Sequence, residues 1–221
     1  LNVLPFCRMA PKDERFLSII RHTCGYSGEK MHVLERTITM EIVVLPEMEP
    51  AQTHMIFIVV PRFNITTLIT MIETVRIANY LAPAPIFSWE VASFDGEKVI
   101  ASNGMTTTVA VANDNLQPAK FVFILGSWGT EYYTNSNLTA WLRKRARKGE
   151  RVCGVELGCY IIARAGLLDG KTATTHWSWL NGFRENFDRV EVEESLFTLD
   201  SKVMTCSGGL AGVDLMLRLI E

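Results

Sequence analysis

The chain has 221 residues, of which 48% are hydrophobic and 21% are charged, a globular composition that allows one large domain or one domain with an extension. The formal net charge of −2 excludes a strongly basic nucleic-acid-binding protein, because phosphate contacts need clustered lysine and arginine. The sequence has no apolar run near the roughly 20 residues of a membrane span, and early prolines and charges exclude a secretory signal.

The first 50 residues are predicted to form an N-terminal extension of unknown role. A short helix is expected over residues 12–21 and a strand over residues 37–45. Pro46 and Pro50, with their acidic neighbours, are typical of a linker.

From His54 onward, apolar segments alternate regularly between strand and helix patterns. Strands are predicted over residues 55–60, 87–94, 99–101, 120–125, 151–155 and 172–174, with a hairpin formed by 196–199 and 202–206. Helices are predicted over 66–81, 137–148, 159–168, 177–187 and 208–220. This alternation predicts an α/β fold with a mostly parallel sheet covered on both faces. Ligands of such folds bind at the carboxyl ends of the strands.

Two further compositional features limit the function. The basic residues within 143–151 are expected to form a solvated face at a helix end, where cations suit the helix dipole. The five cysteines have no metal-ligand spacing, and their odd number favours reduced thiols in a cytoplasm. Neither a metal nor a cofactor is therefore expected.

The segment RVCGVELGCYIIARAGLLDG, residues 151–170, is the most informative part of the sequence. A short apolar strand runs into a helix through a turn that contains Gly158, which is the pattern of a nucleophile elbow. Such a turn lifts one side chain above the sheet, and here that residue is Glu156. A carboxylate is poorly suited to act as an acyl-transfer nucleophile.

Residues 54–221 resemble the PfpI-like, class I glutamine-amidotransferase-like domain of GlxA-type AraC-family transcriptional regulators. The resemblance rests on three ordered motifs: PRFNITTLITMIETVRIAN (61–79), GVELGCYIIARAGLLDGKTATTHW (154–177) and TCSGGLAGVDLMLRLIE (205–221). It implies a flavodoxin-like three-layer α/β sandwich that senses a small molecule, forms a homodimer and passes the signal to a C-terminal DNA-binding domain.

The chain departs from that pattern in two respects. It stops at Glu221, so the DNA-binding domain is absent from this chain and DNA is expected to be bound only through that missing part. Enzymatic relatives place cysteine where Glu156 stands, which removes the expected nucleophile. Cys159 lies one helical turn further on and is expected to point elsewhere.

Glu156 is the first candidate for ligand binding, with a structural cap of the elbow as the alternative. His176 is expected either to face Glu156 across the pocket or to cap a helix. The family resemblance places Glu73 near the elbow, whereas its spacing from Arg76 also suits a surface ion pair.

Further candidates flank the same strand ends. Trp128, Trp177 and Trp179 are expected either to wall the pocket, as aromatic faces do around cationic groups, or to pack in the core. The N–H groups of Gly126 and Ser127 suit an anion, or form an ordinary turn. Asn64 either lines the cleft or caps the helix near Thr66.

Together these features predict a non-enzymatic effector-binding domain whose ligand is a cationic or zwitterionic amine. One alternative is a PfpI-like hydrolase or lyase that uses Glu156 and His176 as acid and base. Another is a structural dimerisation module.

Overall fold

The computed structural model of the chain describes residues 52–112 and 116–221. The helix expected over residues 12–21 and the strand expected over 37–45 lie outside the described residues. All features below belong to the unit that contains residues 52–221.

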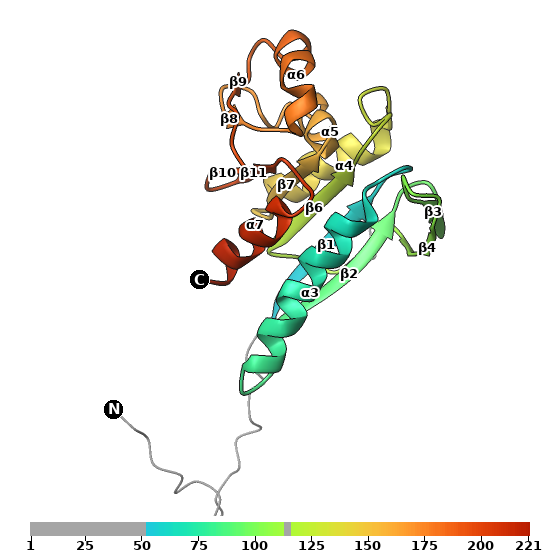
Figure 1. Cartoon of the computed structure of the whole chain (residues 1–221), viewed down its shortest axis with the longest axis vertical. Helices are drawn as coiled ribbons and strands as arrows, with labels where there is room; N and C mark the ends of the chain where they lie inside the picture. Colours follow the sequence, from blue (N-terminus) through green and yellow to red (C-terminus); the bar gives the residue numbers. More distant parts are fainter. Residues whose placement is uncertain (1–51, 113–115) are drawn as a thin grey trace, which may run out of the picture. The chain divides into compact units, whose positions relative to one another are not determined.

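A seven-stranded sheet forms the centre of this unit, in the order β10-β11-β7-β6-β1-β2-β5 (Figure 1). All neighbouring strands are parallel except β10, which pairs antiparallel with β11. The strands are β1 (Thr53–Val59), β2 (Phe87–Ser93), β5 (Ala110–Val111), β6 (Phe121–Gly126), β7 (Arg151–Glu156), β10 (Phe197–Leu199) and β11 (Val203–Cys206). The predicted mostly parallel sheet is confirmed.

The central strands β1, β6 and β7 are mostly apolar and buried because both of their faces are covered. Helices α3 (Ile65–Leu81) and α7 (Ala211–Ile220) contribute to one hydrophobic core. Helices α4 (Ser136–Arg147) and α5 (Gly158–Arg164) contribute to the other, together with α6 (Leu180–Asn186). The result is the expected three-layer arrangement, with α3 and α7 side by side (Figure 1).

Several predicted elements differ in extent. Helix α5 ends at Arg164 rather than Leu168, and Gly166 follows with a φ of 71°. The helix expected over 177–187 is a 3-10 turn, η2 (Trp177–Trp179), followed by α6. The short strand β8 (Thr172–Ala173) pairs with β9 (Glu191–Val192) in a separate sheet. The hairpin of β3 (Lys98–Ile100) and β4 (Thr106–Thr108) was predicted only in its first strand.

The basic cluster near the end of α4 is only partly the solvated face that the sequence predicts. Arg143, Arg147 and Lys148 are exposed, whereas Arg145 is buried and pairs with Glu150 at 2.9 Å. The Arg145 guanidinium also donates to two backbone carbonyls and lies over the Trp141 ring. No described helix combines the length and the apolar character needed to cross a membrane.

Candidate functional site

The turn between β7 and α5 is a strand-to-helix elbow with Glu156 at its apex. Glu156 has a φ of 54°, in the left-handed region that costs a non-glycine residue roughly 1–2 kcal/mol. The turn is tight because Gly158 lies directly over β6: a Cβ at this position would be 1.9 Å from the carbonyl oxygen of Ile124. The elbow predicted from the sequence is therefore present, and it places a carboxylate at the carboxyl ends of the parallel strands.

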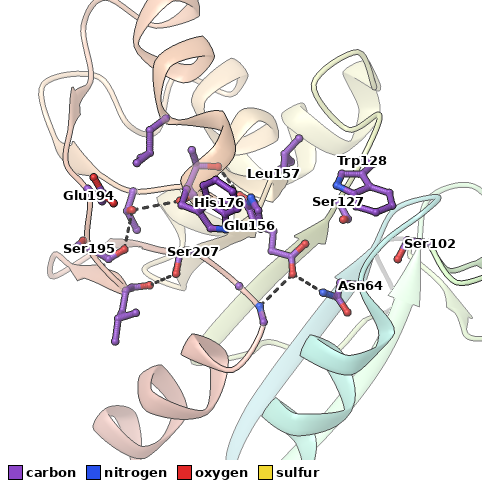
Figure 2. A pocket seen from close by; sticks show the side chains of 17 residues that line it. Asn64, Ser102, Ser127, Trp128, Glu156, Leu157, His176, Glu194, Ser195 and Ser207 are labelled. Carbon is purple, nitrogen blue, oxygen red and sulfur yellow. Dashed lines mark hydrogen bonds between the residues drawn. The ribbon is translucent and has the colours of Figure 1, made fainter.

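One oxygen of the Glu156 carboxylate accepts several hydrogen bonds. Oε1 accepts from Asn64 Nδ2 at 2.8 Å, from Thr67 Oγ1 at 2.9 Å and from the backbone N–H of Gly209 at 3.1 Å. The residue is only 3% exposed. Figure 2 shows the other oxygen without a dashed line to the residues drawn, and the described residues provide no hydrogen bond to it. The carboxylate is thus anchored through one oxygen, and no described residue bonds the other.

Gly208 supports this arrangement through close approach. Its φ is 86°, and a Cβ built on it would lie 1.7 Å from Glu156 Cγ. Any side chain at this position would occupy the space of the carboxylate. The glycine after β11 is therefore part of the site, although it offers no functional group.

The elbow opens into a pocket with a volume of about 620 Å³, within the usual range for a small-molecule site. Glu156 and Glu194 both line it, and the described lining residues include neither lysine nor arginine. Many of the other polar lining residues carry hydroxyl groups, among them Ser102, Ser127 and Ser207. The pocket therefore has an acidic and hydroxyl-rich lining.

The structure brings most of the predicted site residues together. Six line the pocket: Asn64, Ser127, Trp128, Glu156, His176 and Trp177. Figure 2 shows Trp128, Ser127 and Ser102 on one side of Glu156, and Glu194 and Ser195 on the other. Asn64 fulfils both of its predicted roles, since its Oδ1 also accepts from the first amides of α3.

Glu73 and Gly126 do not line the pocket. The Glu73 side chain is about half exposed on α3 and forms an ion pair with Arg76 at 2.6 Å. Hydrogen bonding from Arg76 lowers the Glu73 pKa. The surface ion pair, which the sequence left as an alternative, is the observed arrangement. Gly126 is buried at the end of β6, and its carbonyl accepts from the N–H of Leu157.

His176 caps a helix, which is one of the two roles expected for it. Its Nδ1 lies 2.8 Å from Ser178 Oγ and accepts weakly from the Ser178 N–H, so the ring caps η2. The residue is half-buried and also lines the pocket. Thr175, its neighbour, donates to the backbone carbonyl of Glu156 at 2.8 Å and fixes the elbow.

Core packing, one of the two alternatives for the tryptophans, does not apply to Trp128 and Trp177. Trp128 is 59% exposed and Trp177 is 72% exposed, and both line the pocket. Trp179 packs edge-on against Tyr160 and belongs to the margin of the core. Two indole rings are thus available to a ligand.

The described cysteines are unsuited to nucleophilic chemistry. Cys153, Cys159 and Cys206 are free and buried. Burial raises the pKa of Cys206 to about 12 and holds the Cys159 pKa well above its usual range. The Cys159 thiol donates to the carbonyl of Gly154 and does not line the pocket, as its position in the helix predicts.

Thr67, Gly208 and Gly209 were not predicted as site residues. Thr67 is 1% exposed in the first turn of α3, and a helical threonine gives no sign of a distant partner. The Gly-Gly pair lies one residue after the last predicted strand and could have indicated this contact, because glycines near a strand end often mark a close backbone approach.

Comparisons with known proteins agree with this geometry. Residues 63–221 match the DJ-1/PfpI family. The chain is 35% identical over 164 residues to the HTH-type transcriptional regulator CdhR of Pseudomonas aeruginosa, covering 74% of this chain and 48% of that protein. It is 30% identical over 165 residues to the HTH-type transcriptional regulator GlxA of Rhizobium meliloti, covering 74% and 51%.

A solved structure of an AraC family transcriptional regulator from Pseudomonas putida superposes with a TM-score of 0.69 at 21% identity, covering 76% of this chain and 90% of that one. This similarity confirms the flavodoxin-like fold. The chain spans about half the length of the curated relatives it matches. The family match covers most of the chain, and the chain therefore belongs to the DJ-1/PfpI family.

Proposed function

We propose that this chain is the small-molecule-sensing part of an AraC-type transcriptional regulator and that it acts in the cytoplasm. The observation that carries the proposal is the anchored Glu156 carboxylate in a pocket of about 620 Å³. The similarity to HTH-type regulators over three quarters of the chain supports it. DNA would be bound by a segment of the regulator outside these 221 residues.

The lining of the pocket favours a cationic or zwitterionic amine as the effector. Glu156 and Glu194 supply negative charge, and no described lining residue offers a lysine or arginine to neutralise it. The exposed rings of Trp128 and Trp177 suit a quaternary ammonium group, for which a desolvated cation–π contact contributes roughly 2 kcal/mol.

A zwitterionic ligand also needs a partner for its carboxylate. The hydroxyl groups of Ser102 and Ser127 lie on the Trp128 side of Glu156 and are the donors we assign to it (Figure 2). The variant Ser127→Ala is then expected to weaken the binding of glycine betaine more than the binding of tetramethylammonium, which has no carboxylate. An equal loss of binding affinity for the two compounds would contradict this orientation of the ligand.

Calorimetry with glycine betaine, carnitine and arginine tests the effector class. A ligand at a hundred times its dissociation constant adds about 2.7 kcal/mol of stability, which a thermal-shift screen detects. Glu156→Gln should abolish cation binding, whereas Glu73→Gln, on the exposed face of α3, should not. Binding of purely anionic or apolar compounds alone, or cation binding unchanged by Glu156→Gln, would refute the assignment.

We further propose that the domain binds its ligand without converting it. The elbow carries a carboxylate, and burial raises the pKa of the Cys153, Cys159 and Cys206 thiols. Amidase and glyoxalase assays of the purified chain should therefore show no turnover. Turnover that disappears in Glu156→Gln would instead support the hydrolase or lyase alternative.

The homodimer is proposed to form through the exposed stripe of α3, defined by Ile69, Glu73, Arg76 and Tyr80. The apolar ends of this stripe are 50% and 83% exposed, and the Glu73–Arg76 pair lies at its centre. Two antiparallel copies related by a two-fold axis between positions 73 and 76 would place Glu73 opposite Arg76 of the partner subunit. The stripe is thus self-complementary, as an isologous contact requires.

Charge reversal distinguishes this contact from a local ion pair. Glu73→Arg and Arg76→Glu should each be monomeric in light scattering, because like charges then face each other across the axis. Mixing the two variants should restore a dimer, since each mutated residue meets its opposite charge. A monomeric wild type, or a mixture that remains monomeric, would refute the interface.

A further inference from the structure

Residues at or just before the N-termini of two helices donate hydrogen bonds to the same oxygen of Glu156, Oε1. Asn64 is the N-cap of α3, and Thr67 lies in its first turn. Gly209 lies two residues before α7 and donates its backbone N–H to Glu156 Oε1. The pocket carboxylate is therefore bonded to the N-terminal end of α3 and to the segment just before α7, and the two helices pack side by side on one face of the sheet.

Thr67 closes this arrangement into a triangle. Its hydroxyl donates to Glu156 Oε1 at 2.9 Å and also accepts from the Gly209 N–H at 2.9 Å. Gly209 donates to the same carboxylate oxygen at 3.1 Å. Each of the three groups is therefore hydrogen-bonded to the other two. A displacement of the carboxylate therefore acts on the Gly209 amide directly, through Oε1, and indirectly, through the Thr67 hydroxyl.

Close packing leaves little room to absorb such a displacement. A Cβ on Gly208 would overlap Glu156, and a Cβ on Gly212 would lie 2.9 Å from Met71 Cγ on α3. The backbone before α7 is thus held against the carboxylate, and the first turn of α7 against α3. Packed interfaces of this kind shift between discrete arrangements and do not deform gradually.

We propose that Glu156 couples the pocket to α7, with Thr67 as the positioning residue. A cation bound at the free oxygen draws the carboxylate toward the pocket, alters the hydrogen bonds at Oε1 and changes the stability of the first turn of α7. This coupling rests on the proposed sensing function. In this proposal, α7 is the element whose stability depends on whether the pocket is occupied.

Hydrogen exchange tests the coupling with glycine betaine as the probe, at a concentration that calorimetry shows to be saturating. Amides of residues 209–213 should change their exchange rate by about fivefold or more, the lower limit of typical allosteric coupling. In Thr67→Val at saturation this change should be lost. Thr67→Ser, which keeps the hydroxyl, should restore it.

Thr74→Val is the matched control, because among the described residues the Thr74 hydroxyl bonds only to the carbonyl of Thr70 on the same helix. This variant should respond like the wild type. Binding of the probe without a change at residues 209–213, or an undiminished change in Thr67→Val, overturns the coupling alone. Failure of the wild type to bind glycine betaine, carnitine and arginine refutes the proposed effector class and removes the basis of the coupling with it.

Discussion

Gly208→Ala should destabilise the fold and abolish ligand binding together. The added Cβ would lie 1.7 Å from Glu156 Cγ and 2.6 Å from both Cδ and Oε1. Because Cγ is close to the backbone of a buried residue, the side chain has little freedom to move aside. Glu156 must leave its position and lose hydrogen bonds at Oε1.

The loss of folding stability in Gly208→Ala has three contributions. A left-handed alanine costs roughly 1–2 kcal/mol, overpacking costs typically about 1–3 kcal/mol, and a lost hydrogen bond to a charged group costs roughly 1.5–3 kcal/mol. Gly209→Ala provides the matched control, because its φ is 57° but nothing lies within 4 Å of its Cβ. Only the first contribution applies there. Gly208→Ala should therefore be less stable than Gly209→Ala by about 3 kcal/mol.

Thermal unfolding followed by circular dichroism measures this difference, which corresponds to about 6–12 °C in Tm for a domain of this size. Calorimetry with glycine betaine should show binding by Gly209→Ala and none by Gly208→Ala. Equal stabilities of the two variants would refute the steric argument. Unchanged binding by Gly208→Ala would show that the carboxylate position is not critical.

Three further predictions concern stability and DNA. Burial lowers the His54 pKa below its ordinary 6.5, so the unfolded chain gains a proton first and stability should fall as the pH drops below that value. Urea unfolding should show a smaller acid-induced loss in His54→Gln than in wild type, and equal losses would contradict this cause. Arg145→Met should cost about 3–5 kcal/mol by leaving Glu150 buried without its partner, whereas the exposed Arg147→Met should cost at most about 0.5 kcal/mol. In a gel-shift experiment the 221-residue chain, with its net charge of −2, should give no sequence-specific shift. A salt-sensitive specific shift would identify the exposed end of α4 as a DNA contact.

The layers and the elbow were predictable because they depend on local sequence patterns. The apolar runs that form β1, β6 and β7 are long enough for strands and too short for helices, and they are buried on both faces. The glycine-bearing turn after β7 places Glu156 at the strand end by chain geometry alone. The short strands β5 and β9 have only two residues each and leave no periodicity to detect.

The shell around Glu156 was not predictable, because it joins residues far apart in the chain. Thr67 and Gly209 are separated from Glu156 by 89 and 53 positions, and only the folded packing brings them together. Glu73, by contrast, was expected near the elbow but does not line the pocket. At about 100° per residue, six positions rotate it well away from the buried face that Thr67 occupies, so it lies on the exposed stripe.

The two exposed tryptophans at the pocket give the protein an intrinsic optical signal. Indole emission depends on contact with water, and a molecule in the pocket would cover part of the exposed Trp128 and Trp177 rings that line it. Trp141 is buried in a core far less accessible to solvent quenchers. A bound ligand should therefore shift emission to shorter wavelength and protect it from acrylamide, so occupancy is measurable in the unlabelled protein.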